Sequence, residues 1–597
     1  MIVLGLSCYF HDAAAALVDD GRLVAAAEEE RFSRVKHDFG FPDRAIQFCL
    51  RQAGVSSSDI DYVVFFEKPF VKFERILSTI VATSPKSSGV FRQAMTAWLL
   101  DKLWVKNRIR AAITIDATRI LFVPHHLSHA ASAFLCSPFE RAATLTIDGV
   151  GEWTTTAIGL GEGSTCSLTD EIRFPHSLGL LYSTFTAFLG FEVNEGEYKV
   201  MGMAPYGTPR YVDKVWQLVR ASSDGSFELD LEYFSFHYSA SKMFNDRFVR
   251  LFGSPRPPEA PFFTVASGYP SYFGPKPGNV RELESENQHY ADIAASVQAV
   301  IEELILRLAR TAHGKTGCTT LCMAGGVALN SVANGRILRE TPITDLYIQP
   351  SAGDGGAAVG AALYAATAIL NEPRRGLMEH AYWGEAHGAA AVAEAVKKAG
   401  LPATRELDEP ALVSRVADLL AAGQVVGWVH GRFEFGPRAL GNRSILADPR
   451  RAEMKDIVNT KIKFREPYRP FAPSVPVEHA ARYFDLVDPE RQLPARFMLL
   501  VTPVRPEARE IIPAVTHVDG SARLQTVVED TNPRYHRLLS TFGEATGVPV
   551  LLNTSFNLRG EPIVNTPAEA LTTFRRSGMD ALVLDRTIVF KEQEAAT

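Results

Sequence analysis

Three histidines stand close together in the segment VPHHLSHAASA, and their spacing could serve to bind a metal ion. If the segment is helical, His125 and His129 are four residues apart and share one face, which is a spacing that grips one ion. Asp148, after an apolar strand in TIDGVGE, and Asp354, in the turn SAGDGG, could complete the ligand set. Two imidazoles with carboxylates suit Fe, Mn or Zn better than Mg or Ca. The alternative is that His125, His126 and His129 are capping or core residues and that the aspartates form turns.

Glycine turns follow two other apolar runs and could bind phosphate. Gly149 and Gly151 lie in IDGVG, and Gly325 and Gly326 lie in AGGVALN. Without side chains, such turns let backbone amides approach phosphate oxygens, and a following helix N-terminus adds positive potential. Plain turn formation is the alternative. His11 follows the first apolar strand and could act as a general base, although a single histidine there could equally be structural.

Basic residues are concentrated beyond residue 430, in loops rich in glycine, proline and aromatic residues. Planar guanidinium groups suit phosphate or carboxylate binding, and neighbouring glycines and prolines indicate loops of defined shape. Surface ion pairs are the alternative. The group comprises Arg438, Arg443, Lys463, Arg465, Arg469, Arg523 and Arg559. Lys36, in RVKHDFG, resembles part of a solvated charge cluster when it is taken alone.

The elements that must position these residues follow an alternating pattern. Apolar strands end in glycine or small polar turns and lead into helices, for example in TTLCMAGG and SAGDGGAAVGAAL. This alternation predicts an α/β fold with the turns gathered at strand ends. Three such turns, in GLSCYFHD, IDGVG and MAGG, favour a duplicated α/β ATPase architecture. An Asp-Gly pair between AAAALV and LVAAAEE predicts a hairpin.

Composition shifts divide the chain. The segment from about 208 to 285 is rich in Pro, Phe, Tyr and Ser and indicates an irregular insertion. Pro, Gly and charged residues then interrupt the pattern at 371–388, and a second α/β region follows. We therefore expect one domain over residues 1–375 and another over residues 376–597.

The overall composition is that of a folded, water-soluble protein. The 597 residues include 62 Lys and Arg against 68 Asp and Glu, which gives a formal charge of −6 and no basic face for wrapping nucleic acid. No basic leader or apolar span of about 18 residues is evident, so we expect no membrane association. The six cysteines lack CxxC spacing, which suits reduced thiols and a cytoplasmic location.

The motifs taken together resemble the O-carbamoyltransferase family, of the nodulation-factor, tobramycin, cephalosporin and saxitoxin-pathway type. The resemblance covers nearly the whole chain, and the order of the motifs is more specific than any one of them. The matching segments are FHDAAAALV, AEEERFSRVKH, HHLSHAASA, DGVGEW, AGGVALN, GDGGAAVGAAL, EFGPRALGNRS, YRPFAPS and NTSFNLRGEPIV.

This resemblance implies an N-terminal domain of the duplicated actin/sugar-kinase-like (ASKHA) fold and an α/β YrdC-like C-terminal domain. The second domain would make carbamoyl-adenylate from ATP, taken with Mg, and carbamoyl phosphate. The first would transfer the carbamoyl group to a hydroxyl of a small molecule, such as a natural product or antibiotic precursor. The oligomeric state stays open between monomer and homodimer.

The resemblance also implies roles for particular residues. An iron-like metal (Fe2+, with Mn or Zn as alternatives) would be bound by His125, His129, Asp148 and Asp354. His11 would be the acceptor-side base and Lys36 would touch the nucleotide; Arg438 and Lys463 would complete the catalytic set. The adenylate site would include Gly149, Gly151, Gly325, Gly326, Asn330 and Asp354. ATP and carbamoyl phosphate would be bound in the second domain by Arg438, Lys463, Arg469, Arg523, Asn553 and Arg559.

Two other functions are compatible with parts of the sequence. The first domain taken alone would suit a sugar or small-molecule kinase of the ASKHA type. A metal- and nucleotide-dependent binding protein is the non-enzymatic alternative. Neither accounts as well for the basic motifs of the second domain together with the histidine motif of the first.

Overall fold

The computed structural model describes residues 1–100, 102–270, 273–404 and 407–591, which form two compact units. The first unit comprises residues 1–29 and 39–378, and the second comprises residues 30–38 and 379–597. The short segment 30–38 includes α1 (Glu30–Ser33) and belongs to the second unit although it lies near the start of the chain. The sequence pattern contains nothing that predicts this assignment.

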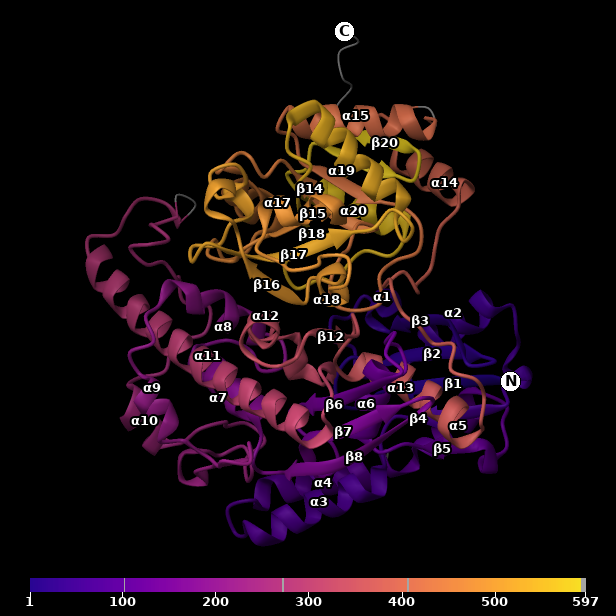
Figure 1. Cartoon of the computed structure of the whole chain (residues 1–597), viewed down its shortest axis with the longest axis vertical. Coiled ribbons are helices and arrows are strands. Elements are labelled where there is room, and N and C mark those ends of the chain that lie inside the picture. The colour runs from indigo at the N-terminus through magenta and orange to yellow at the C-terminus, as the bar shows by residue number, and fades with distance from the viewer. Residues whose placement is uncertain (101, 271–272, 405–406, 592–597) are drawn as a thin grey trace. The chain divides into compact units, whose positions relative to one another are not determined.

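The first unit contains two five-stranded sheets (Figure 1). The first has the order β3-β2-β1-β4-β5, with β1, β2 and β3 antiparallel and β4 and β5 parallel to β1. The predicted hairpin is confirmed as β2 and β3, which flank the Asp-Gly turn. The strands are β1 (Ile2–Ser7), β2 (Ala14–Asp19), β3 (Arg22–Glu28), β4 (Tyr62–Phe65) and β5 (Ile120–Phe122).

The second sheet repeats the topology of the first. Its order is β8-β7-β6-β11-β12, with β6, β7 and β8 antiparallel and β11 and β12 parallel to β6. Each sheet thus runs third, second, first, fourth and fifth strand of its own repeat, which confirms the duplicated architecture. The strands are β6 (Arg141–Ile147), β7 (Thr154–Glu162), β8 (Thr165–Arg173), β11 (Thr320–Ala324) and β12 (Asp345–Ile348).

Two helices in equivalent positions of the repeats pack against each other. α6 (His125–Phe134) follows β5, and α13 (Asp354–Tyr364) follows β12. Each packs on the sheet of the other repeat, α6 on β6, β7 and β11, and α13 on β1 and β2. Glycines permit this close approach, because a Cβ on Gly360 would collide with the Ser128 carbonyl of α6, and one on Gly5 of β1 would collide with the Ala358 carbonyl of α13.

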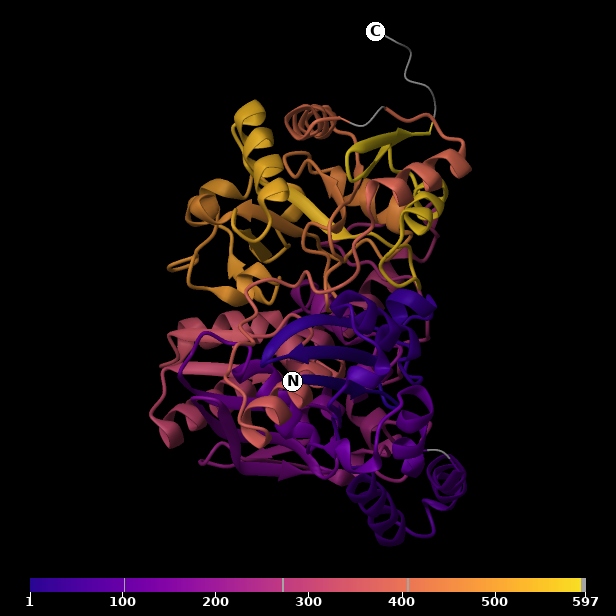
Figure 2. The same cartoon turned by 90° about the vertical axis from the view of Figure 1, so that its right-hand side faces the viewer.

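The long helix α11 (Val280–Thr316), magenta in Figure 1, buries an apolar face and is capped by Gly317, whose φ is 67°. None of the helices in the described ranges is both long and apolar enough to cross a membrane. The paired helices α3 and α4, indigo in Figures 1 and 2, lie side by side. Further elements of this unit are α2 (Asp43–Ala53), α3 (Pro69–Ala82), α4 (Ser88–Leu100), α5 (Val105–Ala112), α7 (Leu178–Phe188), α8 (Glu197–Met203), α9 (Val212–Trp216), β9 (Val219–Ala221), β10 (Phe227–Leu229), α10 (Asp246–Phe252) and α12 (Ser331–Glu340).

The second unit is built on an eight-stranded mixed sheet with the order β16-β17-β15-β18-β14-β13-β19-β20. β15 pairs with β17 in parallel and with β18 antiparallel, so the sheet departs from the purely parallel arrangement of a doubly wound fold. The strands are β13 (Val426–Val429), β14 (Arg443–Ala447), β15 (Ala472–Pro476), β16 (Leu500–Pro503), β17 (Ser521–Val527), β18 (Leu551–Ser555), β19 (Ala581–Leu584) and β20 (Thr587–Phe590).

Two separate hydrophobic cores cover the faces of this sheet. Along β13, Val426 and Trp428 belong to the core under α15 and α19, whereas Val429 belongs to the core under α14 and α20. The alternation follows the two-residue period of a strand, so the continuous apolar sequence is buried on both sides. The helices are α14 (Ala389–Ala399), α15 (Glu409–Ala421), α16 (Met454–Ile457), α17 (Ala480–Tyr483), α18 (Leu493–Arg496), α19 (Pro533–Thr546) and α20 (Pro567–Arg576).

The contact at Gly360 yields a test of how α6 and α13 are held together. Gly360→Ala should destabilise the first unit by about 1–3 kcal/mol, because the added methyl group meets the Ser128 backbone and the helices must separate. A lower melting temperature in scanning calorimetry would show this. The matched control is Gly314→Ala in α11, where a Cβ would meet nothing within 4 Å and should leave stability equal or higher. Equal melting temperatures for the two variants would contradict the packing argument.

Candidate functional site

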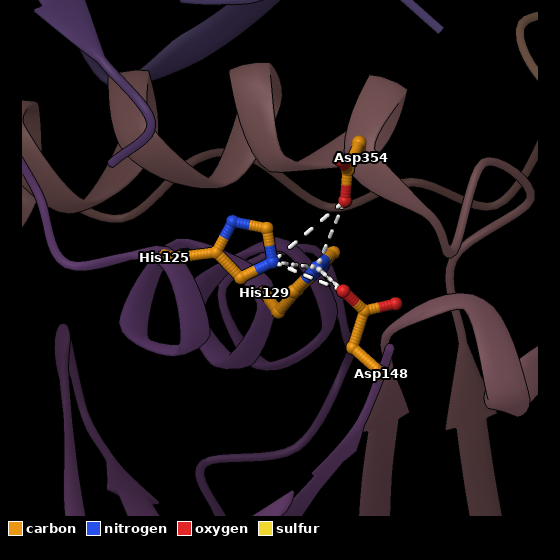
Figure 3. Close-up of side chains that lie close together, drawn as sticks. All are labelled: His125, His129, Asp148 and Asp354. Atoms are coloured by element: carbon orange, nitrogen blue, oxygen red, sulfur yellow. Dashed lines mark hydrogen bonds and ion pairs between the residues drawn. The ribbon is translucent and has the colours of Figure 1, made fainter. Parts of the chain in front are cut away.

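Four ligand-type side chains converge in the first unit, between the two helices just described (Figure 3). The Nε2 atoms of His125 and His129 lie 3.1 Å apart. The Asp148 Oδ2 atom is 3.2 Å from the His125 Nε2, and the Asp354 Oδ1 atom is 3.4 Å from the His129 Nε2. All four residues are buried, and one ligand atom from each lies within 4.8 Å of the others.

Local structure holds each of these side chains in place. α6 begins at His125, and the Glu152 carboxylate accepts a hydrogen bond from the His125 backbone amide at 3.0 Å. Asp148 directly follows β6, and its Oδ1 accepts a hydrogen bond from the Gly326 amide at 2.9 Å, which leaves Oδ2 directed at the histidines. Gly151 makes room for the ring, since a Cβ there would lie 2.8 Å from the His125 Cδ2.

The donor set fits a transition-metal dication. Within the described residues, the Nδ1 atoms of both histidines and the Asp354 Oδ2 are buried without a hydrogen-bond partner, whereas both Nε2 atoms face the centre. Burial lowers the pKa of His125, but the hydrogen bond to Asp148 and the charges of Asp354 and Asp148 outweigh it and raise that pKa to about 9. A cation entering among two imidazoles and two carboxylates would displace this proton and neutralise the buried carboxylates.

The third histidine of the motif points away from this group. The His126 Nδ1 lies 2.8 Å from the Thr146 Oγ1 in β6. Burial, together with the charges of His125 and His129, holds the pKa of His126 well below its usual value. His126 is therefore a neutral side chain that ties α6 to the sheet.

His11 lies within the electrostatic field of Asp354, with both ring nitrogens engaged. Its Nδ1 is 2.7 Å from the Asp12 Oδ2, and its Nε2 is 2.9 Å from the Asn194 carbonyl oxygen. Burial lowers the pKa of His11, but Asp12 more than offsets this and raises the pKa to about 9. The ring is thus protonated at neutral pH and must release a proton before it can act as a base.

The predicted glycines bracket Asp148 and help to orient it. Gly325 has a φ of 92° and packs against the Ile147 carbonyl, so a side chain there would be strained as well as crowded. The space beside Gly149 is open to 4 Å. Asn330 caps α12, since its Oδ1 accepts a hydrogen bond from the Ala333 amide at 3.2 Å, and it also bonds to Gln298. In this structure Asn330 therefore serves as the N-cap of α12.

The second unit brings most of the predicted basic residues together. Burial is the main reason that the pKa of Arg523 lies well below its usual value, and the like charges of Arg438, Arg465 and Arg469 lower it further. The pKa of Lys463 is lowered well below its usual value by burial and by three neighbouring cations. The resulting cationic cluster comprises Lys36, Arg438, Lys463, Arg465, Arg469 and Arg523. Lys36 reaches it from the segment 30–38.

Lys463 is anchored at the end of strand β18. Its Nζ donates hydrogen bonds to the Ser555 carbonyl at 2.7 Å, the Asn557 carbonyl at 2.8 Å and the Asn557 Oδ1 at 2.6 Å. It ends a short π-helical turn, and Phe464 then takes a left-handed conformation with a φ of 49°. The amine is therefore fixed in position beside the arginines by backbone acceptors.

A buried polar network adjoins the cluster and includes two residues that the sequence analysis did not single out. The Asn553 Nδ2 donates to the Gln525 Oε1 at 2.8 Å, and the Ser474 Oγ donates to the same oxygen at 2.5 Å. The Asn553 Oδ1 is buried without a hydrogen-bond partner among the described residues. Gln525 lies in β17 and Ser474 in β15, so polar residues within apolar strands were the available signal. Arg559 is half exposed, 4.0 Å from Glu466.

Arg443 does not join the cluster, although its sequence context resembles that of the other arginines. It is 1 % exposed, and its guanidinium donates to the carbonyls of His430 and Asn442 at 2.9 Å and of Asn565 at 3.1 Å. Burial lowers the pKa of Arg443 to about 10. This arginine is structural, because it ties the loop between β13 and β14 to the backbone at Asn565.

Two family models match this chain, and each covers most of one of the two units. A family model described as the carbamoyltransferase N-terminus matches residues 2–363, and one described as the carbamoyltransferase C-terminus matches residues 417–591. An uncharacterized protein of Synechocystis sp. is 45% identical over 99% of this chain and 96% of its own length.

Two further relatives have more informative names. Nodulation protein NolNO of Sinorhizobium fredii is 39% identical over 98% of this chain and 79% of its own length. The 3'-hydroxymethylcephem-O-carbamoyltransferase of Streptomyces clavuligerus is 40% identical over 41% of this chain and 44% of its own length. The resemblance identified in the motifs is confirmed: the chain belongs to the carbamoyltransferase family and is a transferase of that family.

Proposed function

We propose that this protein is an ATP-dependent O-carbamoyltransferase that works through carbamoyl-adenylate. The second unit makes the adenylate from ATP and carbamoyl phosphate. The first unit transfers the carbamoyl group to a hydroxyl of a small molecule of the natural-product class. The observation that carries the proposal is the cationic cluster around Lys463 and Arg523, found in a chain that also has a buried His/Asp group in its first unit.

The cationic cluster supports the first half-reaction. Buried like charges repel one another and are stabilised by an anion that bridges them, and guanidinium groups bind phosphate through paired hydrogen bonds. ATP, taken with Mg, and carbamoyl phosphate would supply such anions. The atoms balance with one water: ATP, carbamoyl phosphate and water give carbamoyl-adenylate, pyrophosphate and inorganic phosphate. Water first cleaves carbamoyl phosphate into carbamate and inorganic phosphate. A carbamate oxygen then bonds to the α-phosphorus of ATP, and the bond from that phosphorus to pyrophosphate breaks.

The His/Asp group supports the second half-reaction. A bound dication would supply Lewis acidity toward the adenylate phosphate. Asp148, oriented by the Gly326 amide, and the open space at Gly149 favour a phosphate near the loop. The acceptor oxygen attacks the carbamoyl carbon, the bond to the AMP oxygen breaks, and His11 in its neutral form takes the hydroxyl proton.

Removal of one central cation tests adenylate formation. The wild-type protein should release pyrophosphate and phosphate from ATP and carbamoyl phosphate and exchange labelled pyrophosphate into ATP. Arg523→Gln should lose about 10²-fold or more of this rate, because one charged donor aimed at the developing phosphate charge is gone. Arg575→Gln, on the exposed face of α20, is the control and should match the wild type.

Other outcomes distinguish the alternatives. Release of ADP together with a phosphorylated product would indicate a kinase. Tight ATP binding without any turnover would indicate a binding protein. Either result would refute the adenylate mechanism.

Loss of a histidine ligand separates the two half-reactions. His129→Ala should lower the bound metal, measured by plasma mass spectrometry, and abolish carbamoyl transfer. It should leave pyrophosphate exchange measurable, because His129 belongs to the first unit and the cationic cluster to the second. The exposed His479 is a matched control, and His479→Ala should keep the metal. Unchanged metal content in His129→Ala would rule out the ligand assignment.

The contact between His11 and Asp12 predicts a pH dependence. A base acts in its deprotonated form, so the transfer rate should rise with pH through the pKa of His11, which Asp12 raises to about 9. Asp12→Asn removes the charge that raises this pKa, so the rise should move to lower pH. Product formation measured by mass spectrometry between about pH 6 and pH 10 checks this. Identical pH–rate profiles for the wild type and Asp12→Asn would show that Asp12 does not set the pKa of the catalytic base.

A further inference from the structure

A cavity of about 200 Å³ lies in the first unit beside the end of β4 and the helices α3 and α4. None of its lining residues was among the predicted site residues. They are Tyr9, Phe10, Phe65, Glu67, Pro69, Lys72, Arg75, Ile76, Trp98 and Lys102. The wall thus contains three cations, one carboxylate and several aromatic rings.

Two of the three cations have partners in the protein. The Lys72 Nζ forms an ion pair with the Glu67 Oε2 at 2.5 Å, which uses the only carboxylate among the lining residues. The Lys102 Nζ donates a hydrogen bond to the Tyr9 carbonyl at 2.6 Å. The carboxylate is therefore already matched by one lysine, and the remaining positive charge of the cavity is not balanced by its own lining.

Arg75 is the cation of this cavity for which the described residues provide no direct ion pair. It is 7 % exposed, and within the described part of the chain its guanidinium has no hydrogen bond or ion pair, its Nε being buried without a partner. The Phe174 ring lies beside it, with its centroid 4.8 Å from the guanidinium carbon. The negative charges of Glu67 and Glu152 also act on Arg75, but Glu67 is paired with Lys72 and Glu152 accepts hydrogen bonds from backbone amides. A buried guanidinium without an acceptor is costly, and it binds a planar carboxylate well because its donors form a fork. The geometry therefore calls for an anion from outside the chain.

The rest of the wall suits a flat apolar body. The Phe10 ring, 40% exposed, lies under the Lys72 Nζ at 4.6 Å, and the Trp98 ring stacks near Phe73. The volume is below the roughly 300–1,000 Å³ of cavities that enclose whole drug-sized ligands. The cavity can thus hold a ring-sized part of a ligand and leave the remainder outside.

The cavity and the His/Asp group share a wall. The Glu67 Oε2 lies 4.0 Å from the His125 Nδ1. The Lys68 amide donates to the Glu152 carboxylate at 2.7 Å, and the same carboxylate accepts from the His125 amide. A molecule anchored at Arg75 would therefore extend from a site next to the proposed transfer centre.

We infer that this cavity binds the acceptor of carbamoyl transfer through an acidic group, a carboxylate that pairs with Arg75 while its apolar frame packs on Phe10 and Trp98. The inference rests on the proposed function for its second half, the transfer to that acceptor. It specifies the substrate class as a hydroxyl compound that also carries a carboxylate. Binding itself can be measured without any turnover.

The experiment uses the full chain and a matched pair of probes, para-hydroxymethylbenzoate and its methyl ester. Saturation-transfer NMR and calorimetry measure binding in the absence of ATP and carbamoyl phosphate. The acid should bind about 10-fold or more tightly than the ester. Arg75→Gln should lower the affinity for the acid by a similar factor and leave the affinity for the ester unchanged. The affinity of Arg75→Lys for the acid should lie between those of the wild type and Arg75→Gln. Arg92→Gln, an exposed arginine of α4, is the control and should bind the acid like the wild type.

A second variant guards against a folding defect at Arg75. Phe10 is partly exposed, so Phe10→Ala should fold normally. It should lower the affinity for both probes, because the contact with the ring is lost. Equal affinity of acid and ester, or unchanged acid binding by Arg75→Gln, would overturn the inference. Selective binding of the acid that requires Arg75 would support the inference, even if no carbamoylated benzoate forms. A missing carbamoylated product would instead count against the proposed carbamoyl transfer.

Discussion

The close packing of α6 against α13 is the constraint on which the first unit depends. α6 carries His125 and His129 and follows the first sheet, whereas α13 begins at Asp354 and follows the second. The four ligand atoms can converge only if the helix backbones approach to a distance that admits no side chain at Gly360. The same contact places each helix on the sheet of the other repeat, so the fold and the geometry of the His/Asp group have one cause.

Charge is distributed differently in the two units, and this follows from the chemistry proposed for each. The first unit buries carboxylates and imidazoles together, an arrangement that a cation stabilises. The second unit gathers guanidinium and amine groups, and burial together with their mutual repulsion lowers the pKa of Lys463 and Arg523, an arrangement that anions stabilise. The net charge of −6 does not reveal either cluster, because it is a sum over the whole chain and carries no information on where the charges lie.

Much of the architecture could be predicted because it depends on neighbours in sequence. The β2–β3 hairpin follows from an Asp-Gly pair between apolar runs, and the helices after the glycine turns follow from apolar spacing. The pairing of His125 with His129 follows from helical geometry alone. The equal topology of the two sheets was expected only in outline, because strand order depends on contacts between segments far apart in the chain.

The sequence by itself determined the family, through the order of its motifs, and the residue types available for metal and phosphate binding. Only the tertiary structure decided which of these residues converge. The sequence context of Arg443 resembles that of the other arginines, but its guanidinium donates its hydrogen bonds to backbone carbonyls. Lys36 belongs to the second unit although it lies near the start of the chain. Arg75 has no motif at all, and burial without an acceptor is what marks it. The physical reason is that burial and electrostatic fields depend on what surrounds a side chain in space, which local sequence does not encode.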